Sequence, residues 1–483
     1  MKRLLLTLPG FVIAAGCAAP AMQHVERPMV TPATQPSASL ALDSSQVRPM
    51  YREMLAIDLP TVARVASAQN IDIEQAQQRV QAAQGRYDSS VQALLPVVAP
   101  TIAFQHVEGV NQAVNGTLVP VNIDTFLPSI SLQWILNPGR VAYDIVASKR
   151  RLEASQQLEQ AVIQETTRTA AVQYYDLVLA QARLAVANQS VAQAEELLRI
   201  NRLRSQTGAG LPADELRASA SLAAYQQDLA LAAYNFFQAS VALTLTLHLD
   251  PAVTLVPQPR EIAQTTLVRD EMSIDDLLAT ALQYRPDLES ARILVRAAEA
   301  DAKSAGWGGL GPQVQAGYSF GGIAADASSA GTSSLHEQQK AGVGAGFSLD
   351  ASTFGRLKTA TASQQLTALE AQRQLDRVRA AVVSAQQASI TQSKLIPAAR
   401  QQLESAEEAL RLAETNLRAG TMLTIDVLQA QRSVDDARLR YADAVVHYNQ
   451  SQVNLLAAIG VLEEKNLLPQ LAGVSPTTSP TVR

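Results

Sequence analysis

Residues 194–199 of the chain read AEELLR, and residues 406–411 read AEEALR, 212 positions further on. Other matching pairs lie at nearly the same distance: 212 positions for Gly208 with Gly420 and Asp214 with Asp426, 215 for Asp72 with Asp287, and 216 for Pro96 with Pro312 and Gly139 with Gly355. A spacing that is maintained along most of a sequence indicates an internal repeat. The sequence therefore predicts two copies of one structural unit, at residues 51–260 and 261–467, joined by the Pro-rich segment 251–260.

Each copy contains two long runs that favour helix. The first copy has Val141–Thr207, without glycine or proline, followed by Ala213–Asp250. The second copy repeats them as Arg356–Ala419, interrupted only by Pro397, and Thr421–Ile459. As one helix the first run would be about 100 Å long, which is too long for an ordinary globular domain. The expected structure is therefore a long helical hairpin at the end of each copy, with a glycine-rich tip.

The segments before these helices alternate between apolar and small or polar residues. Residues 129–134, 313–320 and 342–349 show this pattern, and a segment at 98–104 matches 314–320 across the repeat. Alternation over about ten residues is typical of transmembrane β-strands, although a soluble half-buried sheet shows it too. The pattern predicts that Ile130, Leu132, Val314, Tyr318, Val343 and Phe347 face lipid and that Ser131, Gln315 and Gly344 face a lumen. Because an open sheet edge in lipid leaves unsatisfied amides, several chains must share one barrel.

The N-terminus has the features of an export signal. Lys2 and Arg3 precede an apolar stretch, and small residues stand before Cys17, the single cysteine of the chain. We expect residues 1–16 to be a signal peptide. The sequence at Cys17 resembles the lipobox of bacterial lipoproteins, which implies a lipid anchor; the alternative is a signal whose cysteine happens to lie near the cleavage point. Residues 17–50 contain five prolines and predict an extended tether, and residues 468–483 predict a disordered tail.

Several classes of function do not fit the composition. The net charge of −5 argues against nucleic-acid binding, and the absence of an apolar run of eighteen residues argues against a helical polytopic membrane protein. The five histidines are scattered, without metal-ligand spacing. Residues 306–311 read GWGGLG, but this motif precedes Pro312 and a strand, whereas phosphate binding needs it to open a helix. We expect a flexible helix-to-strand crossing there, and no enzyme, catalytic residue, metal site or cofactor.

The sequence resembles the TolC-like outer-membrane efflux proteins over residues 55–462. Four motifs carry the resemblance: YRPDLESARILVRAAEADA (284–302), FSLDASTFGRLKTA (347–360), RAGTMLTIDVLQAQRSVDDAR (418–438) and LLAAIG (455–460). The first copy departs from the family pattern at His248, where the second copy has Gly460. The resemblance implies a mainly α protein with transmembrane β-strands. A homotrimer would share a twelve-stranded barrel, four strands from each protomer, continued by a periplasmic helical barrel.

The resemblance also implies a function and its sites. The protein would be the outer-membrane exit duct of a tripartite system, fed by an inner-membrane pump and a periplasmic adaptor protein. Asp426 matches an acidic residue at the family's periplasmic constriction, and Asp214 is its equivalent in the first copy; alternatively, both acids only cap helices. The hairpin tips predict the adaptor-docking site, at Thr207, Gly208, Ala209, Gly420 and Thr421. The alternative function, a periplasmic structural or adaptor coiled-coil lipoprotein without a pore, explains the helices but not the strands.

Overall fold

The computed structural model describes residues 53–68, 70–208, 210–258, 263–268, 272–327, 335–347 and 351–462. The predicted signal peptide, Cys17, the tether, the tail and the tip residue Ala209 lie outside these residues. The helices are α1 (Leu59–Ala68), α2 (Ile71–Gln92), α3 (Pro138–Gln206), α4 (Pro212–Thr246), α5 (Ile274–Tyr284), α6 (Pro286–Leu310), α7 (Ser352–Ala419) and α8 (Thr424–Ala458). The strands are β1 (Glu53–Ile57), β2 (Val97–Gln112), β3 (Leu118–Leu136), β4 (Val253–Pro257), β5 (Gln313–Ala327) and β6 (His336–Gly346).

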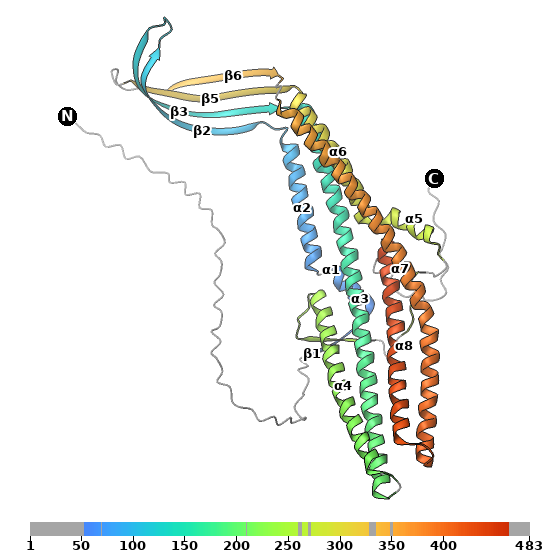
Figure 1. Ribbon diagram of the computed structural model, residues 1–483. Helices are drawn as coiled ribbons and strands as arrows, with labels where there is room; N and C mark the ends of the chain where they lie inside the picture. Colours follow the sequence, from blue (N-terminus) through green and yellow to red (C-terminus); the bar gives the residue numbers. More distant parts are fainter. Residues whose placement is uncertain are drawn as a thin grey trace, which may run out of the picture. The chain divides into compact units, whose positions relative to one another are not determined.

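The two predicted helical hairpins are confirmed. The first consists of α3 and α4, the second of α7 and α8, and Figure 1 shows both tips at the same end. The 69 residues of α3 correspond to a helix about 100 Å long. Pro397 lies inside α7, which continues to Ala419. Among the described residues, one helix, α4, is long and apolar enough to cross a membrane by length and composition, and it packs along α3.

The four predicted strands form one antiparallel sheet in the order β2-β3-β5-β6. They comprise 16, 19, 15 and 11 residues, so three of them exceed the predicted length of about ten. The prediction was too short because the alternation of apolar residues stops before the pairing does. Beyond Phe104, for example, β2 continues through the polar residues Gln105 and His106 and still pairs with β3. The apolar band therefore occupies only part of the sheet.

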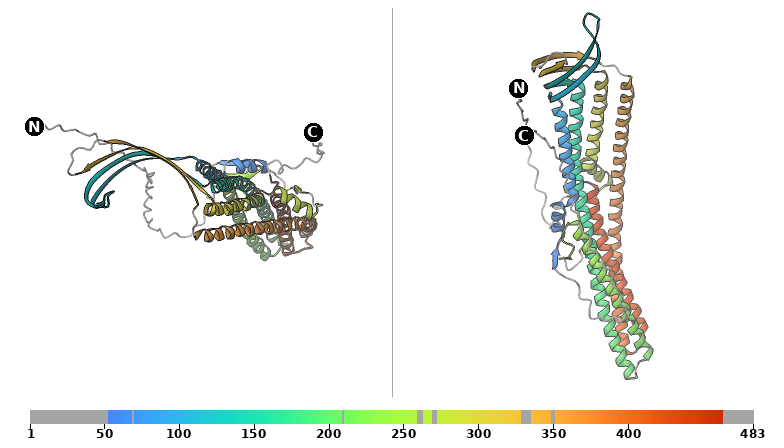
Figure 2. Two further views of the ribbon diagram at one scale, coloured as in Figure 1. Left: turned by 90° about the horizontal axis from the view of Figure 1, so that it is seen from above. Right: turned by 90° about the vertical axis from the view of Figure 1, so that its left-hand side faces the viewer.

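A second, two-stranded sheet was not predicted. β1 and β4 pair in parallel across 200 residues of sequence, and β4 lies within the Pro-rich segment that the sequence assigned to a joint. This small sheet, α1 and α5 pack against the middle of the long helices (Figure 2). Its core contains Leu255 of β4 with Leu177 of α3 and Leu243 of α4, all fully buried. We refer to these flanking elements together with segment 263–268 as the belt.

The duplication is visible in matching contacts at the helix ends. The Asn70 side chain, before α2, donates a hydrogen bond to the carbonyl of Thr246 at 3.0 Å. In the second copy Arg285, before α6, donates to the carbonyl of Ala458 at 3.2 Å. The spacings are 285 − 70 = 215 and 458 − 246 = 212, as in the sequence repeat. Each copy thus connects the start of its short helix to the end of its hairpin.

The glycine-rich segment 306–311 differs from its prediction. It is the last turn of α6 and its C-cap, not a flexible crossing. Gly309 and Gly311 are required by close packing, since an added Cβ would lie 2.0 Å from Cγ2 of Thr353 in α7 and 2.5 Å from the carbonyl oxygen of Trp307, respectively. A Cβ on Gly139 would likewise lie 2.1 Å from the ring of Trp307. The sequence therefore specifies contact between helices at the point where they meet the sheet.

Candidate functional site: the hairpin tips and the sheet

The first hairpin turns at Gly208. Its φ of 71° lies in the left-handed region, where glycine is favoured. Thr207, the C-cap of α3, donates both its backbone N–H and its hydroxyl to the carbonyl of Leu203, at 3.0 and 2.9 Å. Leu211 then precedes Pro212, the first residue of α4, and 63% of Leu211 is exposed. The described tip residues are therefore fixed by backbone geometry and present an apolar side chain to solvent.

The second hairpin turns in the same way at Gly420, with a φ of 78°. The N–H of Thr421 donates to the carbonyl of Asn416 at 3.0 Å, which closes the end of α7. Leu423 is the N-cap of α8, and 65% of it is exposed. Leu211 and Leu423 are thus equivalent, because 423 − 211 = 212, and they have nearly equal exposure.

These two leucines were missed in the prediction of the tips, which relied on glycine. Leucine is a poor N-cap because it offers no oxygen to the free N–H groups of the first turn, and neither leucine caps by side chain. An exposed leucine at the same capping position of both copies is therefore unfavourable for the helix and available for contact. The repeat spacing of 212 residues could have identified the pair from the sequence.

Asp426 and Asp214 both lie in the first turn of the second helix of their hairpin, as predicted. The carboxylate of Asp426 accepts a hydrogen bond from the backbone N–H of Leu423 at 3.3 Å. Asp214 instead forms an ion pair with Arg217 at 3.0 Å. The two equivalent acids therefore have different surroundings: Asp426 contacts the backbone at its own helix start, and Asp214 has a cation beside it.

The two hairpins of one protomer are joined close to their tips. The Arg204 guanidinium of α3 donates to the carbonyl of Leu417 in α7 at 2.8 Å. The Thr424 hydroxyl of α8 donates to the side-chain oxygen of Asn201 in α3 at 2.8 Å. A small apolar cluster lies beside these bonds: Leu197, Leu410, Ala413, Leu417, Val427, Leu428 and Val434. Movement of one tip relative to the other must therefore break specific polar contacts.

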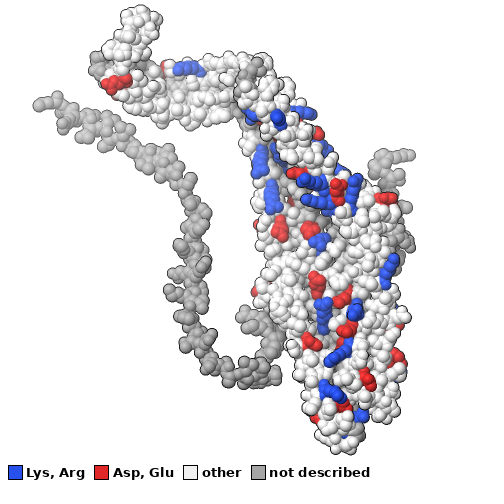
Figure 3. Space-filling model, in the orientation of Figure 1, with Lys and Arg blue, Asp and Glu red and all other residues white. Residues whose placement is uncertain are grey.

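At the other end, the register of the sheet places the predicted apolar residues on one face. Leu132 pairs with Val98 on one side and with Tyr318 on the other. Paired residues of neighbouring strands share a face, and the exposed large apolar side chains of this face include Val98, Ile102, Phe104, Ile130, Leu132, Tyr318, Phe320 and Val343. The opposite face carries Ser131, which pairs with Ala99 and Ser319. In Figure 3 few charged side chains cover the sheet, whereas the helices carry both signs.

In the described part of the chain, no group of three or more His, Cys, Asp or Glu residues is placed to hold a metal ion. The glycine motif 306–311 lies at the end of a helix, where the free backbone groups are carbonyls, so it offers no N–H groups to a phosphate. The described residues with the most distinctive geometry are those of the hairpin tips and of the apolar sheet face.

A sheet that exposes one apolar face, long paired helices and two copies of this arrangement define an outer-membrane efflux protein. The family model described as "Outer membrane efflux protein" matches residues 62–247 and 277–461. The chain belongs to this family, with its sheet in the outer membrane and its helices in the periplasm. The members of the family are channels rather than enzymes.

Individual relatives are more distant. The chain is 29% identical to outer membrane protein TolC of Escherichia coli over 130 residues, 26% of each chain. It is 25% identical to the pyoverdine export outer membrane protein OpmQ of Pseudomonas putida over 318 residues, which are 64% of this chain and 65% of OpmQ. The aligned parts thus span from about a quarter to just under two thirds of these relatives. The crystal structure of the Campylobacter jejuni CmeC outer membrane channel has the same fold, with a TM-score of 0.70 and 18% identity over 86% of this chain and 87% of CmeC.

Proposed function

We propose that the protein is the passive exit duct of a tripartite efflux or secretion system and works as a homotrimer with one shared twelve-stranded barrel. The observation that carries this proposal is the pair of free edges of the four-stranded sheet. β2 and β6 are the edge strands, and they run in opposite directions because the sheet is antiparallel with an even number of strands. Joining β6 of one protomer to β2 of the next therefore continues the antiparallel pattern until three copies close the barrel.

The physical environment supports closure. The exposed apolar face of the sheet fits lipid, and each unpaired edge amide in lipid costs several kcal/mol. Shared strands remove both edges of every protomer. A periplasmic coiled coil without a pore would leave the apolar face in water, so we do not retain it.

The other proposed contacts lie at the ends of the protein. An adaptor would dock on the tips, at Thr207, Gly208, Ala209, Gly420 and Thr421 and at the leucines Leu211 and Leu423, and would link the duct to an inner-membrane pump. Asp426, with Asp214 as its equivalent, is the candidate for a constriction where three copies meet. Lipidation at Cys17 would add an anchor to the barrel. The two structural repeats of the proposed duct are residues 51–260 and 261–467.

Cysteine scanning tests the barrel. In a Cys17→Ser background, single cysteines at Ile130, Leu132, Val314, Tyr318, Val343 and Phe347 should react with a lipid-soluble maleimide. Cysteines at Ser131, Gln315 and Gly344 should react only with a water-soluble reagent. Equal labelling of both sets, or a monomer by light scattering in detergent, would contradict the proposal. Planar-bilayer recording of the purified trimer should show ion conduction, which a protein without a pore cannot give.

A further inference from the structure

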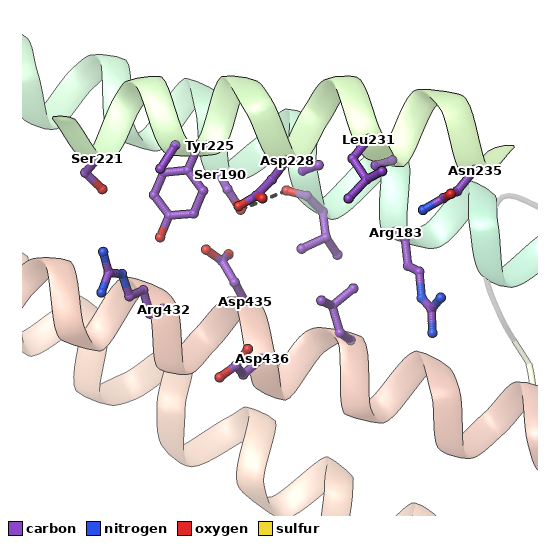
Figure 4. A pocket seen from close by; sticks show the side chains of 15 residues that line it. Arg183, Ser190, Ser221, Tyr225, Asp228, Leu231, Asn235, Arg432, Asp435 and Asp436 are labelled. Carbon is purple, nitrogen blue, oxygen red and sulfur yellow. Dashed lines mark hydrogen bonds between the residues drawn. The ribbon is translucent and has the colours of Figure 1, made fainter. Parts of the chain in front are cut away.

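A groove of about 530 Å³ lies between α3, α4 and α8, away from the hairpin tips. Figure 4 shows Tyr225 of α4 and Asp435 of α8 pointing toward one another. Ser190 comes from α3, Tyr225 and Asp228 from α4, and Asp435 and Asp436 from α8. Asp435 lies nine residues after Asp426, so the groove is separate from the candidate constriction.

Asp435 is the unusual member of the groove. Only 8% of the residue is exposed, and neither carboxylate oxygen has a hydrogen-bond partner. The hydroxyls of Tyr225 and Ser221 are also buried without a partner. Ser190 lies close by, but its hydroxyl donates to the carbonyl of Val186 at 2.9 Å, the bond drawn in Figure 4. Buried polar groups are normally paired, so these atoms are in place for a ligand.

The charges of the groove favour a cation. Asp228, Asp435 and Asp436 contribute three carboxylates, against the guanidinium groups of Arg183 and Arg432. Arg183 forms an ion pair with Asp443, outside the groove, at 3.0 Å. Burial raises the pKa of Asp435, while Ser190, Tyr225 and the Arg438 guanidinium act in the opposite direction.

The other walls favour an organic cation over a bare metal ion. Leu231, Leu439 and several alanines line the groove beside the Tyr225 ring, and an aromatic face attracts an ammonium or guanidinium group. Among the residues that the structure describes, no cluster of His, Cys, Asp and Glu is placed to hold a metal. A cation with an apolar body satisfies both the carboxylate and the apolar walls.

We propose that this groove binds an organic cation, with its charge held by Asp435 and its apolar body against Tyr225 and Leu231. The inference deepens the proposed function, on which it rests, because it names a class of molecule that the duct would bind. It requires no movement of the tips.

Fluorescence titration of the full-length trimer in lipid nanodiscs tests the proposal, with ethidium as the cationic probe and 1-anilinonaphthalene-8-sulfonate as the anionic one. Ethidium should bind saturably, and Asp435→Asn, which keeps the shape of the side chain, should weaken its binding roughly tenfold because it removes a charge-assisted contact. Arg432→Gln should strengthen ethidium binding, since it removes a competing cation. Asp376→Asn is the matched control, because Asp376 is an exposed acid of α7 outside the groove, and it should leave ethidium binding unchanged.

Equal ethidium binding by wild type and Asp435→Asn, or saturable binding of the anion in the same groove, would overturn the inference. If Asp435→Asn fails to assemble, Arg432→Gln decides alone: unchanged or weaker ethidium binding would refute the site. Bilayer recording separates this result from the duct itself. A wild type that conducts but binds no ethidium refutes only the groove, whereas a wild type that does not conduct refutes the proposed function.

Discussion

Thr424, in the first turn of α8, donates a hydrogen bond to Asn201 of α3, and both residues are almost completely buried. The amide group of Asn201 donates in turn to the carbonyl of Leu197 in its own helix, at 2.9 Å. The side chain of Asn201 is therefore held by α3, and Thr424 connects the second hairpin to this fixed point. A displacement of the second tip from the first removes the partner of the Asn201 side-chain oxygen, while the amide group stays bonded to Leu197.

Thr424→Val should loosen the second tip. The substitution keeps the shape of the side chain but removes the hydroxyl, and a buried acceptor without a partner costs about 1–3 kcal/mol. We expect greater resting conductance in planar bilayers and greater entry of vancomycin into cells. Thr415→Val is the control, because Thr415 is exposed on α7 and its hydroxyl only bonds to Arg411 of its own helix. Equal conductance of the two variants would show that this bond does not restrain the tip.

Asp426→Ala should reduce block by divalent cations. Three carboxylates near a threefold axis would bind such ions through oxygen, so their removal should weaken the block and raise resting conductance. Asp214→Ala is the matched control, since Asp214 pairs with Arg217. It should cost only the stability of a helix start, about 0.5–2 kcal/mol. If Asp426→Ala has wild-type divalent sensitivity in bilayer recordings, Asp426 is only a cap.

Leu423→Ser should weaken adaptor docking without lowering the stability of the protein. Serine is a favourable N-cap, so the change should stabilise the start of α8 by about 1 kcal/mol while it removes an exposed apolar contact. We expect weaker adaptor binding in a pull-down and less efflux, with an unchanged or raised unfolding temperature. Leu369→Ser is the control, because Leu369 is exposed on α7 and lies 51 residues before Gly420. Normal adaptor binding by Leu423→Ser would remove the leucines from the docking surface.

His248→Gly should stabilise the protein. His248 has a φ of 52°, the left-handed conformation that Gly460 adopts at the equivalent position with 77°. This conformation costs a non-glycine residue about 1–2 kcal/mol, part of which glycine loses again to its greater freedom in the unfolded chain. The unfolding temperature of the trimer, measured by circular dichroism, should therefore rise.

Gly460→Ala tests the equivalent position in the second copy, and the expected change has the opposite sign. A Cβ there would lie 2.8 Å from Cγ and 2.9 Å from the backbone of Arg285, so the unfolding temperature should fall. Gly355→Ala is the control, because Gly355 lies in α7 with nothing within 4 Å of an added Cβ. A fall in unfolding temperature for His248→Gly would mean that the histidine side chain contributes more than the backbone strain costs.

Mass spectrometry of the mature N-terminus should find a chain that begins at acylated Cys17. Cys17→Ser should still give a folded trimer, because a barrel supplies far more membrane affinity than acyl chains do. A chain that begins elsewhere, or a free thiol at Cys17, would contradict lipidation without affecting the barrel.

Local patterns were sufficient to predict the hairpins. The predicted run Val141–Thr207 corresponds to α3, which spans Pro138–Gln206. A run without internal glycine or proline continues as a helix for as long as neighbouring elements pack against it. The parallel pair of β1 and β4 could not be found in this way. Five-residue strands have little periodicity, and their partners lie 200 residues apart. Their pairing depends on the long helices that bring them together.

The candidate site was predicted only in part, for a related reason. Glycine marks a turn, so the sequence located Gly208 and Gly420. The residue type does not show whether a side chain is buried, however. In the sequence, Asp435 of the motif 418–438 resembles any solvent-exposed acid of a helix. Its lack of partners becomes visible only when α4 is placed across from α8. The repeat identifies the equivalent of each residue in the other copy, but it does not show which helices become neighbours.

The unequal strand lengths of the sheet have a consequence at the cell surface. β2 and β3 remain paired up to Gln112 and Leu118, whereas β3 pairs with β5 only as far as Ile123 and Ala327. Among the described residues, no third strand pairs with the remainder of the β2–β3 hairpin, at the end of the sheet opposite the helices (Figure 1). In a trimer, three such ribbons would form a crown with gaps between them. Antibodies, phages and proteases outside the cell would meet this crown first, so an epitope tag inserted at Gly116 should be accessible on intact bacteria.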